Sequence, residues 1–241
     1  MKYPLICFLA LILIIAGCRN DSEVPKVSYG KKVKNRIQPT KEDTTKIEIA
    51  DLPIQFAGTN MLLFPIGQLQ VSKNSKSSSV EVYGSSEATT FKISNNSDNE
   101  ITGFMTNLKF QKMGQDSLVL LSNKKLFIQS VTYLKEVAQS TKVQLLVYVL
   151  EDDDTNKDGA IDQDDINTLY ISTIDGKNLT KLSVNFEELI DWNLVSASNR
   201  VYFRTIEDSN KNGKFDKGDA VHYQYVNVLD KNFKVVRFKV N

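Results

Sequence analysis

Short apolar segments separated by polar turns fill the chain from residue 47 onward. They are rich in β-branched and aromatic residues, and Asn, Ser, Asp and Gly stand between them. Examples are MLLFPIGQLQV, SLVLLS, VQLLVYVL, TLYIST and NRVYFRTI. Such segments favour β-strands joined by turns. No stretch of about 12 residues shows the period of a helix, although NFEELIDW is compatible with one helical turn. We therefore predict an all-β fold.

The second half of the chain repeats with an offset of 54 residues. Without a polar loop of about 12 residues, the repeat has roughly the length of one blade in a WD-type propeller. We therefore expect repeated antiparallel four-strand units, propeller-like or in open stacked sheets, with a loop inserted in one hairpin of each unit. The matched pairs are Val147-Tyr148 with Val201-Tyr202, Leu169 with Tyr223, Ile171 with Tyr225, and Asn178-Leu179 with Asn232-Phe233.

Two segments of the repeat resemble the blades of TolB-like periplasmic propellers. LYISTIDGKNLTKLS is similar to an outer strand and its turn, and DWNLVSASNRVYFRT is similar to inner strands, with Trp192 at the usual aromatic place. NLKFQKMGQDSLVLLSNKKLF reads as an earlier, shorter unit, which gives about three units, whereas propellers close with four to eight blades. Three alternatives stay open: a degenerate blade in residues 47–100, an open stack of sheets, or edges covered by a partner.

Two polar loops, DTNKDGAIDQDD at 154–165 and DSNKNGKFDKGD at 208–219, lie at equivalent places in the repeat. Calcium loops of the EF-hand supply oxygen ligands from positions 1, 3, 5, 7, 9 and 12, with glycine at position 6. The predicted ligands of the first loop are Asp154, Asn156, Asp158, the Ala160 carbonyl, Asp162 and Asp165. Those of the second loop are Asp208, Asn210, Asn212, the Lys214 carbonyl, Asp216 and Asp219. Both loops therefore predict Ca²⁺ sites.

These loops resemble the EF-hand and dockerin class, and the aspartate at position 12 is closer to the dockerin pattern. By that resemblance, Ile161 and Phe215 at position 8 pack inward. The flanks favour strands, so we expect calcium-filled tips of β-hairpins with a stabilising role. The alternative is an ordinary surface turn, in which Asp, Asn and Gly are common. The first loop has four ligand aspartates and the second has three, which predicts tighter binding in the first.

The first residues carry an export signal. An apolar run from Pro4 to Ala16 is too short to span a bilayer, which takes about 20 residues, and reads as a secretory signal. The letters IAGC resemble the lipobox of bacterial lipoproteins, which implies acylation (palmitate) of Cys18. Since the other cysteine, Cys7, lies in the signal, Cys18 has no disulfide partner. The alternative is a signal peptide that is cleaved elsewhere.

The resulting organisation is a signal peptide at 1–17, a lipidated cysteine and flexible tether at 18–46, and an all-β domain at 47–241. The resemblance to lipoprotein sorting, with Arg19 rather than aspartate after the cysteine, favours the outer membrane of a bacterial envelope, on its periplasmic or surface face. The lipid on Cys18 would then attach the protein to the membrane without crossing it.

The balance of charge and the lack of recognised catalytic motifs exclude some classes of function. The chain has 30 Lys and Arg against 29 Asp and Glu, so no global field draws it to nucleic acid, and we exclude that partner. With one histidine, His222, and no recognised nucleophile motif, we predict a non-enzyme with an envelope protein or a glycan as its partner. The alternatives are an accessory subunit of an envelope complex and a glycan-processing hydrolase. The hydrolase would use Glu187, Glu188 and Asp191 beside Trp192, which otherwise reads as blade core.

Overall fold

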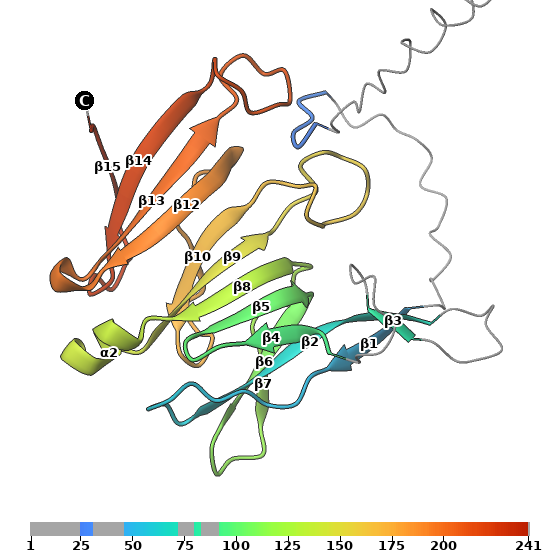
Figure 1. Cartoon of the computed structure of the whole chain (residues 1–241), viewed down its shortest axis with the longest axis vertical. Coiled ribbons are helices and arrows are strands. Elements are labelled where there is room, and N and C mark those ends of the chain that lie inside the picture. Colours follow the sequence, from blue (N-terminus) through green and yellow to red (C-terminus); the bar gives the residue numbers. More distant parts are fainter. Residues whose placement is uncertain (1–24, 31–45, 72–79, 83–91, 241) are drawn as a thin grey trace, which may run out of the picture.

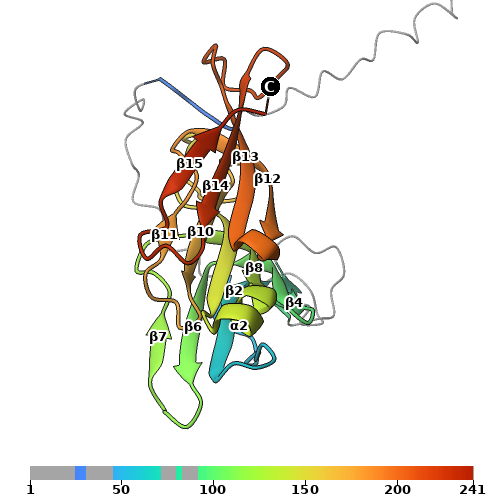
Figure 2. The ribbon, with the colours of Figure 1, turned by 90° about the vertical axis from the view of Figure 1, so that its left-hand side faces the viewer.

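The computed structural model describes residues 25–30, 46–71, 80–82 and 92–240. These residues form three antiparallel sheets that lie one above another along the long axis of the molecule (Figures 1 and 2). We name them the first, middle and last sheets. The predicted all-β class is confirmed. Cys18 and the predicted signal peptide lie outside the described residues.

The first sheet has the strand order β1-β2-β6-β7, and β3 also pairs with β2. The segment MLLFPIGQLQV forms the whole of β2, its longest strand. A short turn joins β6 to β7 within the segment NLKFQKMGQDSLVLLSNKKLF. The strands are β1 (Lys46–Ala50), β2 (Met61–Val71), β3 (Val80–Val82), β6 (Asn107–Lys112) and β7 (Leu118–Leu120).

The middle sheet has the order β11-β10-β9-β8-β5-β4. Its four strands β8 to β11 follow one another as a meander, and β5 and β4 extend the sheet beyond β8. The strands are β4 (Ser94–Asn96), β5 (Glu100–Met105), β8 (Phe127–Tyr133), β9 (Leu145–Glu151), β10 (Thr168–Thr173) and β11 (Thr180–Lys181).

The last sheet is a meander of four strands, β12-β13-β14-β15. A short 3₁₀ turn, η1 (Ser196–Ser198), joins its first two strands. The strands are β12 (Glu187–Val195), β13 (Arg200–Glu207), β14 (Ala220–Asn227) and β15 (Val235–Phe238). The meanders β8 to β11 and β12 to β15 are therefore the two copies of the predicted four-strand repeat.

The two repeat copies differ by one residue in the register of their central strand pair. Tyr148 pairs with Tyr170 across β9 and β10, whereas Tyr202, its repeat equivalent, pairs with Tyr225 rather than residue 224. Side chains alternate between the faces of a strand, so a shift of one residue changes which neighbours share a face. The hairpins are equivalent in topology without being superimposable in register.

Two hydrophobic clusters hold the stack together. One joins the first and middle sheets, and the other joins the middle and last sheets. Strand β9 contributes to both: Leu146, Tyr148 and Leu150 face the first cluster, and Leu145 and Val147 face the second. A strand covered on both faces takes a continuous apolar sequence, which explains VQLLVYVL.

Two local expectations were wrong. The segment NFEELIDW is not helical; it enters β12, where Glu187 and Leu189 are buried and a bulge follows Leu189. A helix that the sequence did not reveal, α2 (Lys135–Thr141), joins β8 to β9. It has only seven residues, which is too short for helical periodicity to show. Among the described residues, no helix has the length and apolar character needed to cross a membrane.

Candidate metal loops

The two predicted metal loops occupy the same place in the two repeat copies. The first connects β9 to β10 and the second connects β13 to β14 (Figure 1). Both project from the same end of the stacked sheets. The fold therefore puts all the predicted ligand residues on two neighbouring hairpin tips.

Backbone amides fold the first loop around its own acidic side chains. The Gly159 amide donates to Asp154 Oδ2 at 3.1 Å, and the Asp158 amide donates to Asn156 Oδ1 at 2.8 Å. The Ala160 amide donates to Asp158 Oδ1 at 2.8 Å. Positions 1, 3 and 5 thus each turn one side-chain oxygen to a backbone amide of the same loop.

Asp165 closes the first loop from position 12. Its Oδ1 accepts the amides of Thr155 at 2.7 Å and Asn156 at 3.1 Å, and its Oδ2 accepts the amide of Asp162 at 3.1 Å. The residue is fully buried. Burial raises the pKa of the Asp165 carboxyl above its ordinary value, against the opposing effect of these amides.

The second loop repeats this network 54 residues later. Six amide bonds have counterparts in both loops, at loop positions 6 to 1, 5 to 3, 7 to 5, 11 to 9, 2 to 12 and 9 to 12. The Gly213 amide donates to Asp208 Oδ2 at 2.7 Å, and Asp219 accepts the amides of Ser209 and Asp216. The two loops carry different residues at six of their 12 positions and share the network, because the acceptors stand at the same positions in both.

The backbone conformation is also shared. Lys157 and Lys211 at position 4 have φ of 66° and 58°, and Gly159 and Gly213 at position 6 have φ of 101° and 84°. Glycine at position 6 was foreseen as the residue that permits the turn. The left-handed conformation of the lysine at position 4 was not predicted, since lysine has no preference for the left-handed region of φ and ψ.

The donor set suits a hard cation. Asp154 Oδ1 is shielded from solvent and accepts no hydrogen bond from any described residue. Calcium binds six to eight oxygens and prefers carboxylates, amide oxygens and backbone carbonyls. These are the groups that the two loops supply, so the residue types fit Ca²⁺, whereas among the described residues no three carboxylates of either loop lie within 4.8 Å of one another. Of the apolar residues at position 8, Ile161 lines a groove together with Leu126 and Phe127, and both it and Phe215 are partly buried.

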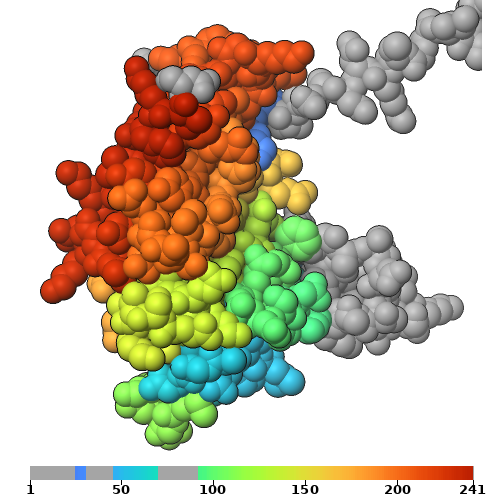
Figure 3. Space-filling view, turned by 60° about the vertical axis from the view of Figure 1, so that its left-hand side comes forward, coloured from blue at the N-terminus to red at the C-terminus, as the bar shows by residue number. Residues whose placement is uncertain are grey.

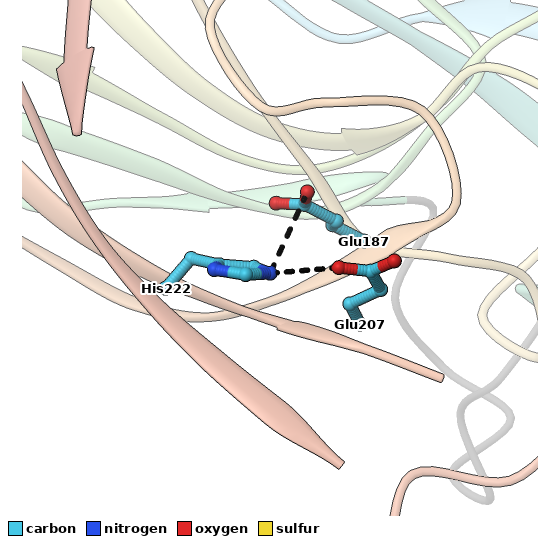
Figure 4. A group of neighbouring side chains, drawn as sticks. All are labelled: Glu187, Glu207 and His222. Atoms are coloured by element: carbon cyan, nitrogen blue, oxygen red, sulfur yellow. Dashed lines mark hydrogen bonds and ion pairs between the residues drawn. The ribbon is translucent and has the colours of Figure 1, made fainter. Parts of the chain in front are cut away.

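His222 belongs to a second cluster, at the base of the second loop (Figure 4). Its Nε2 lies 2.9 Å from Glu207 Oε2 and 4.0 Å from Glu187 Oε1. Glu187 is buried and already paired, because Arg237 donates to its Oε1 and the Thr205 hydroxyl to its Oε2. With both oxygens of Glu187 engaged, the cluster forms a hydrogen-bonded ion-pair network across β12 to β15.

The sequence did not place these groups together, although one signal was present. Glu207 immediately precedes the second loop and His222 lies three residues after it, and the hairpin closed by that loop brings both to the same face. Glu187 comes from a strand whose pairing the sequence did not reveal.

The acidic residues that the hydrolase alternative would use bind different partners and do not form one site. Glu188 binds Lys26 at 2.8 Å and accepts the Asn167 amide at 2.9 Å. Asp191 forms an ion pair with Arg204, which holds the pKa of that carboxyl below its ordinary value. Trp192 packs against the core between the middle and last sheets, as its reading as blade core implied.

Comparisons with known proteins add little. No protein-family model matches the sequence, and no curated protein matches it. A structural search found "The structure of putative TolB from Agrobacterium tumefaciens", with 10% sequence identity over 79% of this chain and 80% of that chain, at a TM-score of 0.23. A likeness at this score supports no inference about function.

Proposed function

We propose that the chain is a calcium-binding lipoprotein of the bacterial envelope, in which two Ca²⁺ ions stabilise neighbouring β-hairpins of a surface that binds another envelope component or a glycan. One observation carries the calcium part: the same six amide-to-side-chain bonds organise both acidic loops at equivalent places in the fold.

Calcium has a physical task in these loops. In the first loop, four ligand aspartates stand within 12 residues, and their mutual repulsion opposes the folded hairpin until a divalent cation neutralises it. Outside the cytoplasm calcium is plentiful, so sites of modest affinity stay occupied. The ions then act as permanent parts of the structure.

The envelope part of the proposal comes from the sequence. A lipobox-like IAGC at the end of a short apolar run supports acylation of Cys18, and Arg19 after it supports the outer membrane. A multiply acylated cysteine holds a protein on a membrane far more durably than a single chain does.

Calorimetry on the mature protein tests the calcium sites. Wild type should bind two Ca²⁺ ions, and the double variant Asp154→Ala/Asp208→Ala should bind none. Asp164→Ala and Lys217→Ala, which alter side chains outside the ligand set, should both keep two ions. Absence of binding to wild type at millimolar Ca²⁺ would remove the proposal.

Detergent-phase partitioning tests the anchor separately. Protein expressed with its own signal should enter the detergent phase and be retained by membranes, whereas Cys18→Ser should stay in the aqueous phase. Equal partitioning of the two would show that Cys18 carries no lipid.

A further inference from the structure

Residues 25–30, which we call the strap, lie between the two loops although they are more than 100 residues away from both in sequence. Figure 3 shows them against the first loop and the last sheet, and Figure 1 shows them between the two hairpin tips. They fall within the stretch for which the sequence predicts a solvated tether. The contacts below show that this part of it lies on the domain.

The strap is hydrogen-bonded to the first loop along its length. The Ser28 amide donates to the Thr155 carbonyl at 2.8 Å, and the Thr155 hydroxyl donates to the Lys26 carbonyl at 2.7 Å. The Lys157 ammonium donates to the Gly30 carbonyl. These contacts use loop positions 2 and 4, which alternate with the predicted ligands at positions 1, 3 and 5.

The other side of the strap meets the second loop. Gly213 approaches the strap so closely that a Cβ there would lie 2.6 Å from the Val27 carbonyl oxygen and 3.0 Å from Pro25 Cβ. Partial burial and a hydrogen bond to the Asp208 carboxylate raise the pKa of Tyr29 to about 12. Loop positions 1 and 6 therefore form the second wall of the strap site.

The strap is also fixed at its centre. Val27 is only 2% exposed, and the neighbouring Lys26 forms an ion pair of 2.8 Å with Glu188. Burial of this apolar side chain stabilises the docked strap. The strap is thus held by apolar burial, by one ion pair and by hydrogen bonds to a loop whose shape depends on its carboxylates.

We infer that calcium in the two loops holds the strap in place and so sets how far the domain stands from its membrane anchor. The inference rests on the proposed function. A metal ion bound at positions 1, 3 and 5 would fix each loop. It would thereby fix positions 2 and 4 of the first loop and positions 1 and 6 of the second, which contact the strap. When calcium leaves, the carboxylates of the first loop repel one another and the strap loses both walls of its site.

Release of the strap changes the reach of the tether several-fold. From Cys18 to Pro25 the chain spans at most about 25 Å, since an extended residue covers about 3.5 Å. From Cys18 to Lys46, where β1 begins, it spans at most about 100 Å. The first point at which the chain is held on the domain would then be Pro25 in the calcium-loaded protein and Lys46 in the calcium-free one.

Hydrogen exchange at the Ser28 amide tests the inference, with calorimetry on the same full-length mature protein. With Ca²⁺ the amide should exchange slowly, and with a chelator at least roughly tenfold faster. If Ca²⁺ binds and the Ser28 rate is the same in both conditions, the inference fails and the proposed function stands. If Ca²⁺ does not bind, the proposed function itself fails.

The coupling between strap docking and calcium binding supplies a second, independent test. Val27→Asp should release the strap without altering any loop residue, and calcium affinity should then fall roughly tenfold, because coupling between two sites is reciprocal. Val240→Asp changes an exposed valine and should leave affinity unchanged. Trp192 fluorescence would confirm that both variants are folded, and unchanged affinity in a folded Val27→Asp protein would overturn the coupling.

Discussion

Asp165 holds Thr155 by a bond of 2.7 Å between its carboxylate and the Thr155 amide, and the same carboxylate binds the amides of Asn156 and Asp162. Because Asp165 is fully buried, its removal would leave amide donors without an acceptor even in the absence of metal. Asp165→Ala should therefore lower the free energy of unfolding in chelator by about 3 kcal/mol.

Urea denaturation in chelator checks this prediction. Asp164→Ala, which truncates an exposed side chain of the same loop, should be within about 0.5 kcal/mol of wild type. Asp219→Ala in the second loop should cost less than Asp165→Ala, since Asp219 is only partly buried. If Asp165→Ala lowered the free energy of unfolding in chelator no more than Asp164→Ala does, Asp165 would stabilise the protein only by binding metal.

The two loops differ at position 5, where the first has Asp158 and the second has Asn212. Removing one carboxylate weakens the attraction for a divalent cation, and adding one strengthens it. Asp158→Asn should lower the calcium affinity of the first loop roughly tenfold, and Asn212→Asp should raise that of the second by a similar factor. Calorimetry of each variant, with the other loop disabled by Asp154→Ala or Asp208→Ala, would measure this; affinities that do not change would refute the charge argument.

Local structure could be predicted from the sequence, whereas contacts between residues far apart in the chain could not. The strand segments and both loops depend on residues close in the chain, so TLYIST and the glycines at position 6 predicted them directly. Lys26 shows the limit: its partner Glu188 is 162 residues away, and nothing near Lys26 signals a contact.

The order of strands in the sheets could not be predicted from the sequence either. Strand β5 joins the middle sheet beside β8, while β6, which follows it closely in the chain, joins the first sheet beside β2. Both strands have only six residues, and each mixes buried with partly exposed positions, so their sequences do not distinguish the two destinations. The open stack was one of three alternatives, and the choice among them depends on such pairings.

Burial raises the pKa of Glu151 to about 8, despite a hydrogen bond from Gln129. The folded protein therefore keeps this proton up to about pH 8, whereas the unfolded chain releases it near the ordinary value of 4.5. Between these two values the folded state binds more protons, so stability should fall as pH rises. Glu151→Gln should remove this loss and be more stable than wild type at pH 9 by on the order of 2 kcal/mol.

Thermal unfolding of both proteins between pH 5 and pH 9 would measure the effect. Glu136→Gln changes an exposed glutamate of α2 and should leave the pH profile as it is in wild type. If Glu151→Gln and wild type keep parallel profiles over this window, the proton on Glu151 does not influence folding.

The stacking of the first and middle sheets depends on Gly176, in the turn after β10. Its φ is +75°, and a Cβ at this position would lie 2.4 Å from a carbon of the Phe110 ring, which is buried in β6. Gly176→Ala should therefore cost both backbone strain and displacement of Phe110, together about 3 kcal/mol. Gly114 is a matched control, because its φ of +79° gives the same strain while no heavy atom lies within 4 Å of the added Cβ. Gly114→Ala should cost only about 1 kcal/mol in the same urea titration, so equal losses for the two variants would show that contact with Phe110 does not limit the packing of the sheets.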